Sequence, residues 1–275
     1  MTRFGDTSQL SPAESGILGK LTAWLIAAGL IVPIVVVIGL AFAGGLYLEF
    51  PPDLLSLDPL QEVISSSEWR RAFTQSVLAA AFAAPLATAL ATAAALGVRR
   101  TRHGRLIQTV MILPLIVPLI VTALAIYPVF SDFGLVGRTQ GIVFAHALIA
   151  LPFAFLTVYA SVRGLDPQLE RAAASLGASW FQTLARVTLP LMLPAIIASL
   201  IVSLAVSFDE VVLSLYVSSP RTRTVPILVF ARLREDLSPE VAAAALLIVC
   251  VNIGIMVAAT VAARVAIERR RSLDS

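Results

Sequence analysis

The sequence contains one cysteine and two histidines among 275 residues, and this scarcity excludes several kinds of site. Cys250 stands alone inside an apolar run, so neither a disulfide framework nor a cysteine-based metal site is expected. His103 and His146 belong to no H-E-x-x-H motif, and the chain has no G-x-x-x-x-G-K-S/T phosphate loop and no dinucleotide-binding glycine fingerprint. We therefore expect a chain that binds no metal and no cofactor and is not itself an enzyme.

Charged residues are also scarce, at 13% of the chain, whereas a soluble domain has about 25%. Hydrophobic residues make up 58%, and the mean hydropathy is +0.91. The net charge is +3, but the basic residues lie beside apolar runs and form no stripe with aromatic residues, so nucleic acid is not an expected partner. The composition predicts an all-α, polytopic protein surrounded by membrane lipid.

Six charge-free stretches reach the length of about 20 residues that a membrane helix needs. They are Leu21–Leu48, Ala72–Val98, Leu106–Ser131, Thr139–Val162, Val187–Phe208 and Val241–Ala263. The first has no signal-peptide cleavage site after it and is too long for a signal-peptide core, so we interpret it as a retained span. Six spans place both termini on one side, and thirteen of the twenty basic residues then share that side. Because cytoplasmic loops are enriched in lysine and arginine, we expect cytoplasmic tails at residues 1–20 and 266–275.

Three prolines interrupt the third predicted span, and two polar loops face the other side of the membrane. Proline kinks a helix, so the third span is either a bent helix lining a pathway or a packed kink without a ligand role. In the first outside loop, residues 49–71, Ser67 is expected to cap a helix and Trp69 to lie at the membrane interface. In the second, residues 218–239, the apolar run 227–233 predicts a short helix at the outer surface.

The longest polar interruption between spans is Glu170–Pro194. Asp166 and the following proline predict a capped helix start, and Gly177 can adopt the left-handed conformation that ends a helix. Ser179 can cap a second helix, Trp180–Leu189, that leads into the fifth span. The pattern predicts a helix, a glycine turn and a second helix at the inner surface. It suits a partner's docking site, and an ordinary amphipathic linker is the alternative.

This segment resembles the cytoplasmic signature of ABC-type import permeases of the type I class, roughly E-A-A, three residues, G, nine residues, I, one residue, L-P. The alanine pair, the glycine and the final L-P match, with Val187 in place of the isoleucine. Arg171 stands where the signature has glutamate, and Glu170 comes one residue earlier. The resemblance implies a coupling helix over residues 166–177 that docks on a cytoplasmic ATPase. It assigns that role to Glu170, Arg171, Ala172, Ala173, Gly177, Leu189 and Pro190.

Three further runs resemble the spermidine/putrescine-type subgroup of these permeases. They are His146…Leu151-Pro152-Phe153…Thr157-Val158-Tyr159, Ser207-Phe208-Asp209-Glu210-Val211-Val212 and Leu237-Ser238-Pro239-Glu240. The resemblance covers residues 65–265, a permease core of five membrane helices that follows the first membrane helix at 21–48. It implies a bacterial inner-membrane importer that moves a small cationic solute, such as a polyamine, by alternating access. Other amines, amino-acid derivatives and metal complexes are the alternatives.

The same resemblance implies the partner chains. They are a cytoplasmic ATPase dimer that binds and hydrolyses ATP, a second permease subunit and an extracytoplasmic substrate-binding protein. The second permease is expected to be a related chain rather than a second copy.

Ionisable residues at membrane depth are costly and usually face a cavity or a partner, so we expect a substrate pathway near the end of the fifth span. Its candidates are Asp209, Glu210, Phe208, Ser207 and His146. Adjacent helical residues point about 100° apart, so one acid could line the pathway while the other pairs with Arg221 or Arg223, or both could form an interfacial cap. Hydrogen bonding inside the bundle is expected for His146 rather than proton relay. Serines at 199, 203 and 207 predict close helix packing.

Three other classes of protein remain as alternatives. A proton-driven carrier could use the two acids and His146 as relay groups, but no inverted repeat relates residues 21–131 to 139–264. An intramembrane enzyme would need a nucleophile with a base or a set of metal ligands, which the sequence does not show. A scaffold without a pathway would not need the kinked third span or the acids.

Overall fold

The computed structural model describes residues 12–45, 48–235 and 237–271, with side chains described between residues 19 and 261 except at 259 and in the gaps. Within these ranges the chain is helical, with one isolated antiparallel bridge between Ala43 and Leu55. The helices are α1 (Pro12–Ala41), α2 (Asp58–Ser65), α3 (Ser67–Arg100), α4 (Gly104–Ile116), α5 (Leu119–Asp132), α6 (Thr139–Gly164), α7 (Pro167–Ser175), α8 (Trp180–Thr183), the π-helical turn η1 (Leu184–Thr188), α9 (Leu189–Phe208), α10 (Val212–Val217), α11 (Val225–Glu235) and α12 (Pro239–Arg271). The predicted all-α class is confirmed.

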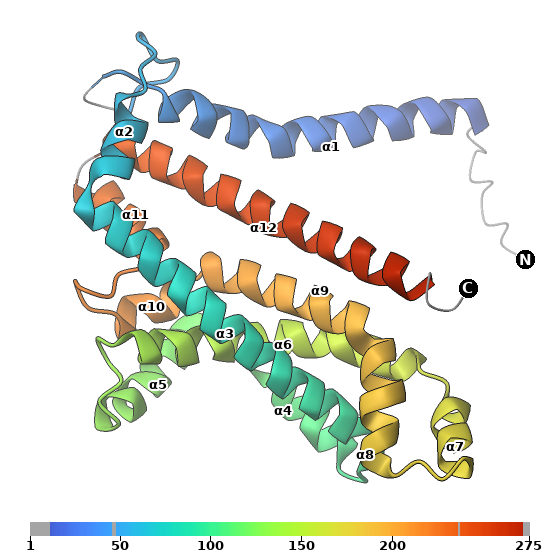
Figure 1. Cartoon of the computed structure of the whole chain (residues 1–275). Helices are drawn as coiled ribbons and strands as arrows, with labels where there is room; N and C mark the ends of the chain where they lie inside the picture. The colour runs from blue at the N-terminus through green and yellow to red at the C-terminus, as the bar shows by residue number, and fades with distance from the viewer. Residues whose placement is uncertain (1–11, 46–47, 236, 272–275) are drawn as a thin grey trace, which may run out of the picture.

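The core of the molecule is the packing of α3 against α6 and α9 (Figure 1). One face of α3 has an alanine at every fourth position, and each is fully buried: Ala83, Ala87, Ala91 and Ala95. Opposite them lie Ala147, Ala150, Ala154 and Phe155 of α6. Lipid tails are as apolar as leucine, so membrane helices associate through close packing, and small residues let the backbones approach.

Five helices are long and apolar enough to cross a membrane, and the bent pair α4–α5 would make a sixth. The first predicted span is displaced: α1 begins at Pro12 and ends at Ala41, so the described residues 42–45 and 48 lie beyond the helix. Residues 12–20 belong to α1 instead of a separate tail, and 266–271 continue α12. The remaining tail residues, 1–11 and 272–275, lie outside the described part of the chain.

The third predicted span consists of two helices, and the bend that its prolines predict is present. Between α4 and α5 the chain turns by 106° at Val117 and Pro118. Proline has no amide hydrogen and disfavours helical backbone at the preceding residue, and Val117 is extended with φ −79° and ψ 127°. Pro114 and Pro128 lie inside the two helices, so one proline of the three breaks the span.

The ends of the molecule are well separated in Figure 1. The first turns of α1, the last turns of α12 and all of α7 lie at one end, and α2 and α11 lie at the other. Helix α1 packs mainly against α12, and its side chains remain exposed, including Trp24 at 75% and Leu30 at 70%. This apolar surface is available to lipid or to another membrane subunit.

At the end that carries α2 and α11, two details differ from expectation. The cap of α3 is Ser66, whose hydroxyl accepts from the amide of Glu68 at 3.3 Å, and Ser67 is the first helical residue. Trp69 is 1% exposed and packs within a core cluster at this end. The predicted short helix exists as α11. Its first residues are buried, and the amide of Val225 donates to Ser76 of α3 at 2.9 Å.

Candidate functional site

The inner-surface segment folds as its capping residues predict. Asp166 Oδ1 accepts from the amide of Gln168 at 2.8 Å and begins α7. Gly177 has φ +82°, and the amide after it, at Ala178, donates to the carbonyl of Ala173 at 3.1 Å. This is the left-handed helix ending that glycine adopts without strain. Ser179 and Gln182 form a reciprocal capping box at the start of α8.

The second helix joins the fifth span through a π-helical turn that the sequence analysis does not predict. Helix α8 leads into η1 and then into α9 without a loop, and the amide of Leu189 donates to the carbonyl of Leu184, five residues back. The next residue, Pro190, has no amide hydrogen to donate. Leu189 and Pro190 therefore lie at the junction with the span and do not share the outer surface of α7.

Helix α7 has no buried residue. Large apolar side chains are exposed on it and just after it: Leu169 at 46%, Leu176 at 89%, Trp180 at 58% and Phe181 at 70%. Ala172 is exposed beside them, whereas Ala173 is half-buried. Large exposed apolar side chains are typical of a segment that contacts a partner.

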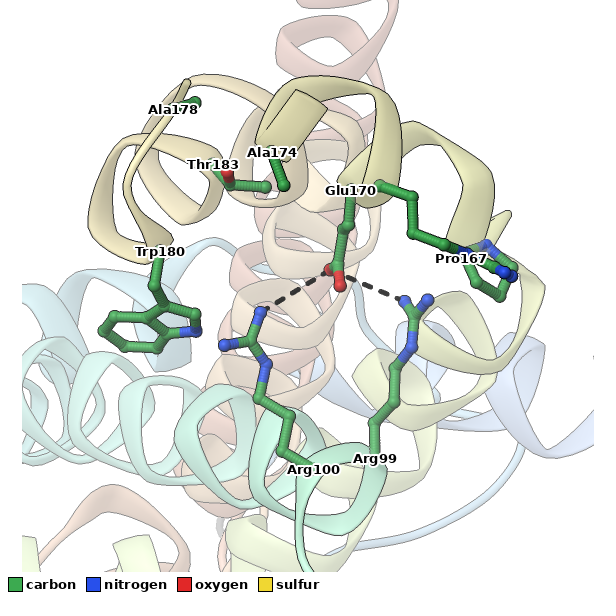
Figure 2. A pocket seen from close by; sticks show the side chains of 9 residues that line it. Arg99, Arg100, Pro167, Glu170, Ala174, Ala178, Trp180 and Thr183 are labelled. Atoms are coloured by element: carbon green, nitrogen blue, oxygen red, sulfur yellow. Dashed lines mark ion pairs between the residues drawn. The ribbon is translucent and has the colours of Figure 1, made fainter. Parts of the chain in front are cut away.

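Glu170 points from α7 toward the end of α3 (Figure 2). Its Oε1 lies 3.8 Å from Arg99 Nη1 and 3.7 Å from Arg100 Nη2, and it accepts a hydrogen bond from Thr188 at 3.0 Å. One carboxylate thus connects α7 to α3 and to the turn that begins the fifth span. The sequence predicted Glu170 as a docking residue and gave no site role to the two arginines. The sequence does carry a signal for this direction. Glu170 comes one residue before the signature position, and one residue along a helix is a rotation of about 100°, so its side chain points to a different side of α7.

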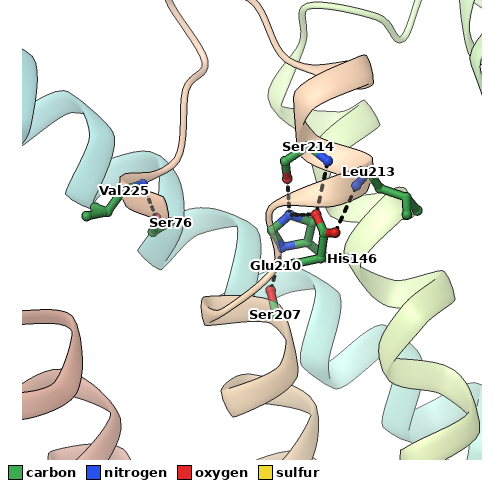
Figure 3. Close-up of polar contacts among 7 residues, drawn as sticks. All are labelled: Ser76, His146, Ser207, Glu210, Leu213, Ser214 and Val225. Carbon is green, nitrogen blue, oxygen red and sulfur yellow. Dashed lines mark hydrogen bonds and ion pairs between the residues drawn. The ribbon is translucent and has the colours of Figure 1, made fainter. Parts of the chain in front are cut away.

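A second polar cluster lies between α6, the end of α9 and α10 (Figure 3). His146 is 1% exposed; its Nδ1 lies 2.8 Å from Ser207 Oγ and its Nε2 2.7 Å from Ser214 Oγ. The carboxylate of Glu210 accepts from the amides of Leu213 at 2.8 Å and Ser214 at 3.0 Å, and lies 3.6 Å from His146 Nε2. The expected hydrogen bonding of His146 inside the bundle is confirmed.

Asp209 and Glu210 are not consecutive residues of one helix, so the predicted angle of about 100° between their side chains does not apply. Helix α9 ends at Phe208, and Glu210 precedes α10, where its side chain caps the first amides. Glu210 is 5% exposed, whereas Asp209 is exposed. Neither acid forms an ion pair with an arginine in the described ranges, so the expected pairing with Arg221 or Arg223 is absent there.

The other pathway candidates lie inside the helix packing. Phe208 is 2% exposed, and Ser207 faces His146. The predicted serine face of α9 packs as expected, with Ser199 donating to Thr88 of α3 at 3.3 Å. Of the five candidates, Asp209 is the one with an exposed side chain.

Comparison with known proteins identifies the family. The profile described as "binding-protein-dependent transport system inner membrane component" matches residues 87–268. The chain belongs to this family. It is therefore a multi-pass inner-membrane permease subunit of an ABC-type importer, a class whose ATPase resides on partner chains.

Individual members of the family show which permeases this chain is similar to. The spermidine/putrescine transport system permease protein PotC of Escherichia coli (strain K12) is 29% identical over 196 residues, covering 70% of this chain and 74% of PotC. The putrescine transport system permease protein PotI of the same strain is 31% identical over 145 residues, covering 49% and 50%. The molybdenum transport system permease protein ModB of Mycobacterium bovis is 30% identical over 205 residues, covering 68% and 77%.

Solved structures of the family share the fold. A chain of a bacterial ABC transporter that imports the acidic polysaccharide alginate aligns with a TM-score of 0.69 at 18% identity, covering 92% of this permease and 96% of that chain. A chain of the MetNI methionine ABC transporter, in an inward-facing conformation, aligns with a TM-score of 0.63 at 16% identity, covering 72% and 95%. These structures support the importer architecture and carry no information about the solute.

Proposed function

We propose that this permease subunit moves a small cationic solute of the polyamine class across the inner membrane by alternating access. The proposed coupling role rests on the position of α7. Its outer side is exposed, and Glu170 on its inner side contacts α3 and η1. The names of PotC and PotI, which mention spermidine and putrescine, support the substrate class. The name of ModB mentions molybdenum, so a metal-containing solute is the alternative.

The partners follow from the two ends of the molecule. A cytoplasmic ATPase dimer would dock on α7, whose exposed apolar side chains suit a protein cleft. With α7 in the cytoplasm, the first turns of α1 and the last turns of α12 would lie on the cytoplasmic side, and the α2–α11 end would face the extracytoplasmic binding protein. A second, related permease chain would cover part of the exposed apolar surface of α1 or α5. ATP would bind only to the ATPase chains, and this chain would hold no cofactor.

The coupling path runs from α7 through Glu170 to α3, and through Thr188 to the start of α9. When ATP closes the ATPase dimer, α7 would move, and the rigid helix α9 would carry that motion to Asp209 at its far end. A ligand can shift such an equilibrium only by binding its two states differently, so the solute must interact more strongly with one of them.

Asp209 is the acid that we assign to the solute. Glu210 already accepts two backbone hydrogen bonds, whereas Asp209 is exposed and has no ion pair in the described ranges. A carboxylate at membrane depth is costly unless it meets a cation or lines an aqueous path, and a polyamine is a flexible polycation. A negative potential in the pathway would raise the local concentration of such a solute.

The test is uptake of radiolabelled putrescine or spermidine per assembled complex. We expect Asp209→Asn to lower uptake about tenfold, the effect of one lost charge-assisted contact, with complex abundance unchanged. The matched variant Glu210→Gln is expected to lower abundance instead, because the cap of α10 weakens. Uptake at the wild-type level in Asp209→Asn would contradict the assignment, and molybdate competing with the polyamine would favour the ModB-like alternative.

A further inference from the structure

A cavity of about 560 Å³ lies under α7, between the last turn of α3 and the start of α8 (Figure 2). Its charged and aromatic lining consists of Arg99, Arg100, Glu170, Arg171 and Trp180. The guanidinium of Arg100 lies 4.9 Å from the centre of the Trp180 ring. The proposed coupling path uses Glu170. It does not explain why the arginines of the cavity outnumber its one carboxylate.

The charges in the cavity do not balance. Three arginines and one glutamate line it, and the two ion-pair distances from Glu170 to Arg99 and Arg100, 3.8 and 3.7 Å, exceed hydrogen-bond length. Arg99 Nη1 is buried and has no hydrogen-bond acceptor among the described residues. A buried donor without an acceptor costs free energy, so the cavity has both the charge and the donors to receive an anion.

The position of the cavity indicates which anion. It lies at the end of α3, a helix long and apolar enough to cross a membrane, and the exposed Trp180 is a residue typical of the membrane interface. Guanidinium groups bind phosphate oxygens through paired hydrogen bonds, and basic pockets between helices on the cytoplasmic side receive anionic headgroups. We propose that this cavity binds the phosphate of an anionic phospholipid, with Arg99 and Arg100 as its donors.

Binding of a headgroup here would act on coupling. A phosphate between the arginines would compete with Glu170 for them and so loosen the connection between α7 and α3. This consequence rests on the proposed coupling role of α7. The lipid site itself does not, because it is tested by binding to the full chain alone.

The experiment measures lipid retained by the purified full chain in native mass spectrometry, with phosphatidylglycerol or phosphatidylcholine added in equal amounts. We expect selective retention of phosphatidylglycerol, reduced about tenfold or more in Arg99→Gln/Arg100→Gln, since hydrogen bonds to charged groups are lost. The matched control is Arg102→Gln/Arg105→Gln, which removes the same charge from exposed neighbours that do not line the cavity. We expect it to retain the lipid at the wild-type level.

A second variant keeps the proposal testable if the arginine pair is needed for folding. Glu170→Gln removes the competing carboxylate, so it should retain more phosphatidylglycerol than the wild type. Equal losses in the cavity and control variants, or no gain in Glu170→Gln, would overturn the proposal. Displacement of the lipid by inorganic phosphate at equal concentration would overturn its assignment to a phospholipid.

Discussion

The two polar clusters of this permease are built in opposite ways. Around His146 four hydrogen bonds of 2.7 to 3.0 Å hold the side chains, which are at most 5% exposed. Around Glu170 there is one hydrogen bond of 3.0 Å, from Thr188, whereas the two ion pairs with arginine are 3.7 and 3.8 Å long and their side chains are 22 to 30% exposed. The first cluster joins three helices into one rigid unit, whereas the second joins α7 to the bundle through contacts that can lengthen or change partners. A coupling element needs the second kind of connection.

Gly177→Val should have the largest effect on function and a smaller effect on stability than the change at His146. A β-branched residue at φ +82° costs about 1–3 kcal/mol, and it would displace the turn that aims α7. We expect normal membrane insertion, loss of transport and ATP hydrolysis that no longer responds to solute, measured on the reconstituted importer. The control is Gly164→Ala, a position with open space and no positive φ. Wild-type transport by Gly177→Val would show that the turn is not needed.

His146→Ala should have the largest effect on stability. The substitution empties a buried site and leaves the hydroxyls of Ser207 and Ser214 without their partner. We expect a loss of roughly 2–4 kcal/mol, seen as reduced abundance and a lower unfolding temperature. His103→Ala is the control, because His103 is exposed and should change neither quantity. Reduced transport per complex at normal stability would instead indicate a relay role for His146.

Glu170→Ala should lower transport several-fold while the complex still assembles. The side chain contacts α3 and η1 and lies on the inner side of α7, so docking should survive and transmission should weaken. The readout is the ratio of solute moved to ATP hydrolysed. Loss of ATPase binding would place Glu170 in the docking surface and remove the contrast between the inner and outer sides of α7.

Arg171→Glu should have the smallest effect. It restores the acid of the family signature at an exposed position that borders the cavity under α7, and we propose that the helix itself presents the docking surface. Transport and assembly are expected to stay within about twofold of the wild type, as surface substitutions usually do. Complete loss of assembly would show that the arginine makes a specific contact with the ATPase.

Much of the fold was predictable because its signals are local. Helix beginnings at Asp166 and Ser179, the turn at Gly177 and the start of α12 at Pro239 follow from the chemistry of single residues acting on the neighbouring backbone. The spans followed from apolar length, which lipid enforces on any chain that crosses it. Helix α7, for which we propose a docking role, was predicted in the same way, from spacing along one segment.

Features that depend on distant partners were not predictable. Three prolines in one span are locally alike, so the sequence did not show that the 106° turn would fall at Val117 and Pro118. The inward direction of Glu170 depends on Arg99 and Arg100, about 70 residues earlier in the chain.

The acids after α9 show the same division. The sequence by itself determined that two carboxylates follow the fifth span, and it determined the apolar helix that precedes them. Which acid is buried was decided by tertiary structure. Glu210 accepts hydrogen bonds from amides of α10 and lies beside the ring of His146, which belongs to α6. Local chemistry sets where a backbone turns, whereas the direction of a polar side chain is set by the partner that can satisfy it, and that partner is brought close only by folding.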